Sequence, residues 1–227
     1  MNPSTQTGYL SARPLKPNHS NKLGLYPLNL DKTRDGLVFI PVSYHPAQPA
    51  PFILMLHGAG SNSQAGITPF LPLAESQGLI LLAIDSRRQT WDRLRGTFSV
   101  DLAFMDLALS QVLSNYNIDS SHLAIAGFSD GATYALSVGL TNGNLFSHIM
   151  AFSPGFMAPA GLCGTPRLFI SHGTEDQVLP IQSCSRRIVP QIQQAGYEIV
   201  YQEFPGGHTI PPHIVLNVLK WFKPPSS

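Results

Sequence analysis

The chain has 227 residues, a length that fits one large domain. Hydrophobic residues make up 43% of the sequence and charged residues only 12%, which allows a substantial core and disfavours a highly charged helical bundle. The 14 basic and 13 acidic residues form no block of like charge, so nothing favours binding to nucleic acid or to an anionic membrane.

The first 30 residues are rich in Pro, Asn and Ser and show no periodicity. We expect an extended arm over residues 1–30 that lies on a single folded domain of residues 31–227. The N-terminus lacks a basic stretch leading into an apolar one, which argues against a signal peptide. No apolar run reaches membrane-spanning length. We therefore expect a soluble, cytoplasmic protein.

Short apolar runs then alternate with segments of helical spacing. The runs predict strands at residues 36–42, 52–57, 79–85, 122–128, 148–153, 167–172 and 198–204. Helical spacing predicts helices at residues 64–77, 99–116, 131–142, 184–195 and 212–222. This alternation indicates a three-layer α/β fold, with a mostly parallel sheet and helices on both faces. The connection 43–51 is too short for a crossover helix, so we expect the first two strands to form an antiparallel hairpin.

Ser129 lies in the run Gly127-Phe128-Ser129-Asp130-Gly131, after a predicted strand and before a predicted helix. This is the setting of a Gly-x-Ser-x-Gly nucleophile elbow, in which the glycines remove side chains that would clash at a sharp turn. The alternative is a turn serine between packing glycines. Ser153, in the run "AFSPGF", partly mimics such an elbow but is followed by a proline and no helix.

A serine hydroxyl needs a base, and His208 is the best placed of the 8 histidines. It follows Gly206 and Gly207 in the loop after the last predicted strand; His213, inside the last helix, is the alternative. Asp176 follows the strand at 167–172 and would orient the base, with Glu175 as its exposed neighbour.

The reaction also needs hydrogen-bond donors for a developing oxyanion. The N–H groups of Asp130, after the nucleophile, and of Ala59, in the run "LHGAGSN" after an early strand, are the candidates. His57 and His172 are interpreted as residues that order their loops. Candidate pocket residues are Trp91, Phe156 and Met157.

Taken together, "PAPFILMLHGAGSN", "AGFSDGA", "SHGTEDQVLPI" and "FPGGHTIP" resemble the α/β-hydrolase superfamily. The closer likeness is to small serine esterases of the phospholipase/carboxylesterase type, and also to polyhydroxybutyrate-depolymerase-like and feruloyl-esterase-like relatives. The resemblance implies a carboxylesterase without metal or organic cofactor, acting on a small-molecule ester through an acyl-enzyme, with residues 31–227 as the catalytic domain. Thioesterase or peptidase activity with the same triad, and a non-catalytic binding protein, are the alternatives.

One residue departs from the resemblance. Acyl-protein thioesterases usually carry Gln after the nucleophile, whereas this chain has Asp130, whose carboxylate we expect to point away from the site. The short connection after residue 153 predicts an open cleft without a large cap. Cys163 and Cys184 are too few for a disulfide framework or a zinc site and are expected as free thiols, or alternatively as one bridge.

Overall fold

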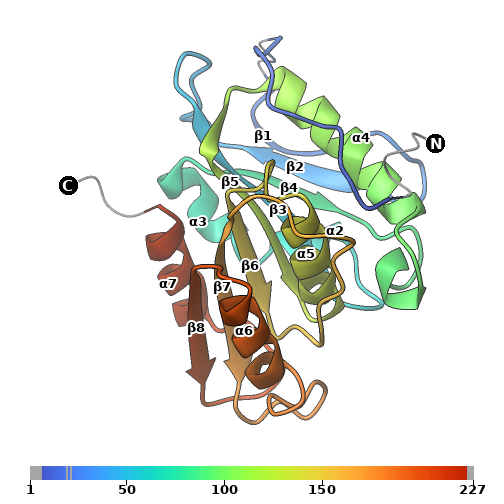
Figure 1. The fold of residues 1–227 in the computed structure, drawn as a ribbon. Coiled ribbons are helices and arrows are strands. Elements are labelled where there is room, and N and C mark those ends of the chain that lie inside the picture. The colour runs from blue at the N-terminus through green and yellow to red at the C-terminus, as the bar shows by residue number, and fades with distance from the viewer. Residues whose placement is uncertain (1–6, 19, 21, 224–227) are drawn as a thin grey trace.

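The computed structural model describes residues 7–18, 20 and 22–223. Within these residues one eight-stranded sheet has the order β1-β2-β4-β3-β5-β6-β7-β8 (Figure 1). The six strands from β3 to β8 run parallel to one another, while β2 is antiparallel to β1 and to β4. The bounds are β1 (Gly24–Pro27), β2 (Gly36–Ile40), β3 (Ala50–Leu56), β4 (Ile80–Ile84), β5 (Ile118–Phe128), β6 (His148–Phe152), β7 (Arg167–Gly173) and β8 (Ile199–Phe204).

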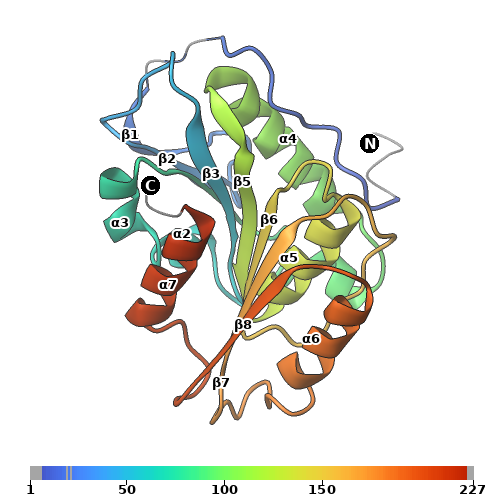
Figure 2. The same cartoon turned by 60° about the vertical axis from the view of Figure 1, so that its left-hand side comes forward.

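Helices cover both faces of this sheet, as predicted (Figure 2). One face packs against α4 (Val100–Asn115), α5 (Asp130–Thr141) and α6 (Ser185–Gln194). The other packs against α2 (Ser63–Ile67), α3 (Leu71–Gln77) and α7 (Pro212–Phe222), and a short 3-10 helix, η1 (Asp92–Arg95), precedes α4. The helix predicted at 64–77 is interrupted before α3, where Pro69 cannot donate a backbone hydrogen bond.

Strands in the middle of the sheet are apolar throughout because each face of the sheet has its own core. Along β3, Phe52 and Leu54 point into the core under α4 and α5, while Ile53 and Met55 point into the core under α3 and α7. All four are buried, and complete burial of such side chains contributes about 1.5–3 kcal/mol each.

The expected antiparallel hairpin between the first two predicted strands is wrong. β2 pairs antiparallel with β4, with Leu37 opposite Ala83, whereas β3 lies between β4 and β5 in parallel register. Burial explains the choice: β2 alternates buried and half-buried residues and suits a place near the edge, while every residue of β3 is buried and needs a strand on each side. The connection 41–49 carries the chain past β4.

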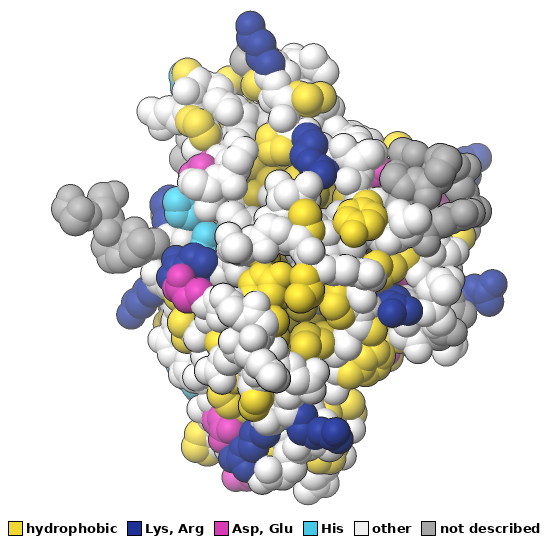
Figure 3. Space-filling model, viewed as in Figure 1, with side chains coloured by type: hydrophobic (Ala, Val, Ile, Leu, Met, Phe, Trp, Pro, Cys, Tyr) yellow, Lys and Arg dark blue, Asp and Glu magenta, His cyan; other side chains and the backbone are white. Residues whose placement is uncertain are grey.

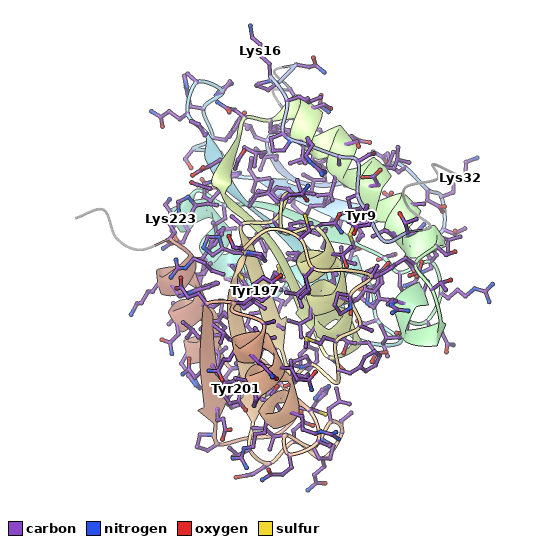
Figure 4. All side chains as sticks on the ribbon, viewed as in Figure 1. Tyr9, Lys16, Lys32, Tyr197, Tyr201 and Lys223 are labelled. Atoms are coloured by element: carbon purple, nitrogen blue, oxygen red, sulfur yellow. The ribbon has the colours of Figure 1, made fainter. Side chains whose placement is uncertain are left out.

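The segment before β1 packs against the helices. Leu10 N–H donates to the Asn142 side chain at 2.8 Å, and the N–H groups of Ser11 and Ala12 donate to Asp106 at 2.7 and 2.8 Å. Figure 4 marks its course with Tyr9, near α5, and Lys16, beyond the end of α4. Because β1 spans Gly24–Pro27, the predicted boundary at residue 30 falls after the first strand of the sheet.

Residues 153–166, between β6 and β7, lie along α5 and form no cap. The hydroxyls of Thr133, Ser137 and Thr141, one helical turn apart, each accept a backbone N–H from this connection at 3.0 Å. Figure 3, which views the molecule from the side of Figure 1, shows apolar side chains gathered near the middle of the face that it draws. Within the connection, Phe156 and Leu162 are 44% and 58% exposed. Cys163 and Cys184 are both free thiols.

In the described part of the chain, no helix is both long and apolar enough to span a bilayer.

Candidate active site

The candidate site lies at the carboxyl edge of the parallel strands, toward which the arrowheads point at the bottom of Figure 1. Crossover connections bring the carboxyl ends of all parallel strands to one edge, so short loops far apart in the sequence meet there. The loops that follow β3, β4, β5, β7 and β8 carry, in this order, residues 57–60, residues 86–91, Ser129, Asp176 and His208.

Ser129 stands on a strained turn between β5 and α5. Its φ of 56° and ψ of −120° lie in a region that residues with side chains rarely adopt. A Cβ on Gly127 would lie 2.2 Å from the Gly131 carbonyl oxygen, and one on Gly131 would lie 2.2 Å from the Leu56 carbonyl oxygen. Both glycines are therefore required by the close approach of β3, β5 and α5.

The three predicted triad residues are brought together. Ser129 Oγ lies 2.9 Å from His208 Nε2, and His208 Nδ1 lies 2.6 Å from Asp176 Oδ2. Because the carboxylate can only accept, Nδ1–H donates to Asp176, which leaves Nε2 free to accept the Ser129 hydroxyl proton. This arrangement can deprotonate Ser129 as it attacks an electrophile.

Asp176 is held as a buried carboxylate. Burial alone would raise its pKa, but hydrogen bonds from Leu179 N–H, His208 and Val178 N–H outweigh that effect and leave the pKa below its usual value. The two N–H groups donate to Oδ1, each at 2.9 Å, so Oδ2 remains available for His208. The loop backbone thus fixes both the charge and the orientation of the carboxylate.

Two other histidines border the site and are held neutral. His172 is fully buried between the Ser185 hydroxyl, 2.7 Å from Nδ1, and the Leu179 carbonyl, 2.8 Å from Nε2. His57 Nε2 accepts Ser86 N–H at 3.0 Å. Burial lowers the pKa of both imidazoles below the usual value. Both rings order the loops around the triad, as the sequence predicted.

The two candidate oxyanion donors flank the nucleophile. Asp130 is the first residue of α5, where backbone N–H groups have no acceptor within the helix. Ala59 follows Gly58, at which an added Cβ would lie 3.4 Å from Ser129 Cβ. The Asp130 carboxylate accepts the Thr90 hydroxyl at 2.6 Å and belongs to no wall of the cavity beside Ser129, in keeping with its expected direction.

A cavity of about 540 Å³ opens beside Ser129 and His208. Among the described residues, no Lys, Arg, Asp or Glu side chain lines it, and the walls are mostly apolar. One wall comes from α2 and the residues after it, with Ala65 and Pro69. The loops that carry Asp176 and His208 also contribute to the walls, with Val178, Thr209 and Ile210.

None of the three predicted pocket residues lines this cavity. Trp91 is fully buried: its indole stacks on Tyr134 with centroids 5.1 Å apart and donates to the His57 carbonyl at 3.0 Å. Phe156 and Met157 lie in the connection along α5. Thr209 and Ile210, which do line the cavity, directly follow His208, so the sequence could have predicted that they lie near the site. The positions of Ala65 and Pro69 depend on where α2 packs, which the sequence does not indicate.

The competing candidates lie elsewhere. Ser153 shares a positive φ, 51°, but its hydroxyl is buried and has no hydrogen-bond partner among the described residues. His213 lies exposed on α7, and its ring packs edge-on against Phe204. Glu175 is exposed, as expected for the neighbour of the buried Asp176.

Known proteins resemble the chain in sequence. A family model described as phospholipase/carboxylesterase matches residues 103–223. A bifunctional acetylxylan esterase/xylanase of Neocallimastix patriciarum is 30% identical over 158 residues, which cover 66% of this chain and 22% of that protein. Feruloyl esterase C of Emericella nidulans is 27% identical over 156 residues, covering 65% of this chain and 57% of that protein. The matches thus span only part of these relatives.

Solved structures share the fold at low sequence identity. The crystal structure of esterase PE8 superposes with a TM-score of 0.68 at 20% identity, covering 84% of this chain and 98% of that one. S-formylglutathione hydrolase of Staphylococcus aureus gives a TM-score of 0.69 at 13% identity, covering 89% and 99%. The chain therefore has the α/β-hydrolase fold.

Proposed function

Because the chain belongs to the phospholipase/carboxylesterase family, we propose that it hydrolyses carboxylic esters through an acyl-enzyme on Ser129. One observation carries the proposal: a hydrogen-bonded chain of 2.9 and 2.6 Å joins Ser129 to His208 and His208 to Asp176 beside an open cavity. A serine raised on a strained turn with a base in contact has the geometry of an activated nucleophile.

In the first half of the reaction, Ser129 Oγ attacks the ester carbonyl carbon while His208 Nε2 takes the hydroxyl proton. The carbonyl π electrons move to the oxygen, and the N–H groups of Ala59 and Asp130 donate to this oxyanion. Asp176 keeps the Nδ1 proton of His208 in place and stabilises the imidazolium. Collapse of the tetrahedral intermediate then breaks the bond to the alcohol oxygen, which receives the proton from His208.

In the second half, a water molecule replaces the alcohol. His208 Nε2 takes a proton from this water as its oxygen attacks the acyl carbon, and the same two N–H groups hold the second oxyanion. When this intermediate collapses, Ser129 Oγ leaves and recovers the proton from His208. The carboxylic acid departs, and the enzyme returns to its starting state.

The substrate we propose is a small, neutral ester with a short acyl chain. The cavity of about 540 Å³ supports this assignment, since its walls are mostly apolar and the connection after β6 lies along α5 and contributes no residue to them. The similarity to feruloyl esterase C of Emericella nidulans adds esters of aromatic acids to the candidates. Because no Lys or Arg among the described residues lines the cavity, it offers no cationic side chain of this kind to pair with a substrate carboxylate or phosphate.

The test is hydrolysis of p-nitrophenyl esters from acetate to palmitate, together with methyl ferulate and with matched thioester and amide substrates. We expect the highest kcat/KM on short esters and no activity above background for Ser129→Ala. Higher kcat/KM on thioesters or amides would replace ester hydrolysis by one of those reactions. Failure of the folded protein to turn over any substrate or to react with a phosphonate probe would favour a binding protein.

A further inference from the structure

Thr90 lies in the loop between β4 and η1 and makes the only hydrogen bond recorded for the Asp130 carboxylate among the described residues. Its hydroxyl donates to Asp130 Oδ2 at 2.6 Å. Thr90 and Asp130 are both half-buried, and neither lines the cavity beside Ser129. The contact therefore holds the negative charge of Asp130 next to the loop that carries Thr90. The backbone N–H of Asp130, by contrast, belongs to the proposed oxyanion hole.

The same loop also holds the segment that carries the other oxyanion donor. Gly60 N–H donates to the Gln89 carbonyl at 2.6 Å, and Ser86 N–H donates to His57 Nε2 at 3.0 Å. The Trp91 indole N–H donates to the His57 carbonyl at 3.0 Å. Residues 57–60 are thus hydrogen-bonded to the loop from both sides of Ala59.

The loop has the rigidity that this role demands. Asp101 is buried in α4 and accepts the N–H groups of Arg87 and Asp92. Asp92 in turn accepts the hydroxyl of Tyr134 at 2.9 Å, and Tyr134 belongs to α5. Buried carboxylates that accept several hydrogen bonds fix the backbone around them. Residues 86–91 therefore connect the start of α5 to the turn after β3.

We infer that Thr90 is a positioning residue for the reaction: it holds the Asp130 carboxylate away from the oxyanion that the N–H groups of Asp130 and Ala59 would bind. This inference rests on the proposed ester hydrolysis. A free carboxylate, whose carbon is three bonds from the donor nitrogen, can rotate toward the site, where like charge disfavours the oxyanion. The neutral ester of the ground state does not meet this repulsion, so the effect belongs to the transition state.

The experiment is a double-mutant cycle in the purified full chain with a short p-nitrophenyl ester. We expect Thr90→Val to lower kcat about tenfold with little change in KM, less than the about 10²–10³ that follows loss of a whole donor. Thr90→Ser retains the hydroxyl and should retain kcat. In the Asp130→Asn background, Thr90→Val should change kcat by less than about twofold, because the charge is gone.

A second readout isolates the oxyanion. A trifluoromethyl ketone of matching acyl length forms an anionic adduct with the nucleophile, so Thr90→Val should raise its inhibition constant by the same factor by which kcat falls. Ser121→Ala is the matched control, because it removes a hydroxyl–carboxylate bond, also 2.6 Å long, to Asp119 at the opposite end of β5. It should leave kcat and the inhibition constant unchanged.

Equal losses from Thr90→Val in the Asp130 and Asp130→Asn backgrounds would overturn the inference, and so would an unchanged inhibition constant. Thr90→Ala gives the same comparison if Thr90→Val does not fold. Absence of ester hydrolysis by the unmodified chain would instead contradict the proposed function. The two failures are distinguishable, because the cycle compares variants of a chain that is itself active.

Discussion

Gly131 provides a direct test of how the elbow is built. A Cβ at this position would lie 2.2 Å from the Leu56 carbonyl oxygen and 2.5 Å from the His57 carbonyl oxygen. Both atoms are backbone and cannot rotate away. Because a carbon–oxygen contact needs about 3.3 Å, Gly131→Ala must push the start of α5 away from the end of β3 by about 1 Å.

That displacement opens the proposed oxyanion hole, since Ala59 belongs to one of the separated segments and Asp130 to the other. A misplacement of about 1 Å near reacting atoms can cost about 10²-fold in rate. Forced overlap in a packed region also costs about 1–3 kcal/mol of unfolding free energy. Without the overlap, replacing a helical glycine by alanine would stabilise the protein by about 0.5–1 kcal/mol. A loss of stability in Gly131→Ala would therefore indicate the overlap, and a gain would indicate that it does not occur.

Gly139→Ala, in the same helix, is the control. There an added Cβ would lie 2.7 Å from Cδ1 and Cγ1 of Ile149 and 3.0 Å from Cγ2 of Ile125, all side-chain atoms rather than backbone, and the position is two turns from the site. We expect Gly139→Ala to keep kcat on p-nitrophenyl butyrate, whereas Gly131→Ala lowers both kcat and the midpoint of urea unfolding. A Gly131→Ala variant with unchanged kcat and increased stability would refute the reasoning.

Three further predictions follow from individual contacts. Asp176→Asn should fold normally, because an amide oxygen can still accept the N–H groups of Val178 and Leu179. Its kcat should fall by about 10³–10⁴, because the asparagine side chain favours the wrong tautomer of His208. A kcat near that of the unmodified protein would contradict the role assigned to Asp176. Trp91→Phe should leave the His57 carbonyl without its hydrogen-bond donor. It should lower the free energy of unfolding in urea by about 1–3 kcal/mol and also lower kcat. An unchanged unfolding midpoint would argue against this hydrogen bond. Burial, followed by the charge of Arg167, lowers the pKa of His148 from 6.5 to about 4. The unfolded chain therefore binds a proton between these values that the folded chain does not, so the unfolding free energy should fall as pH drops from 6.5 to 4 and stay flat with respect to this group above 6.5. His148→Phe should reduce that slope, and an identical pH dependence in the variant would exclude His148 as its source.

Local chemistry at the strand ends was readable from the sequence because each signal lies within a few neighbouring residues. The glycines around Ser129 predict a crowded turn, and the structure places an added Cβ on Gly127 only 2.2 Å from backbone. The alternation of apolar strands and helices predicts which edge of the sheet collects the loops.

What could not be read depends on packing between distant segments. The hairpin prediction failed because short connections restrict which strands can be neighbours but do not decide between them; the different burial of β2 and β3 decides. The position of Trp91 after β4 predicted a residue of the pocket wall. In the structure its indole instead stacks on Tyr134 of α5, in the core. The wall formed by Ala65 and Pro69 carries no motif at all, since it arises from where α2 meets the sheet.

The most direct test of the proposed mechanism is to find the residue that becomes covalently modified. The protein is incubated with a fluorophosphonate, digested, and its peptides are mapped by mass spectrometry, with Ser129→Ala and His208→Ala treated in parallel. The mechanism predicts one adduct on Ser129, none in Ser129→Ala and a strongly slowed reaction in His208→Ala. An adduct on Ser153, or full ester hydrolysis by Ser129→Ala, would contradict it.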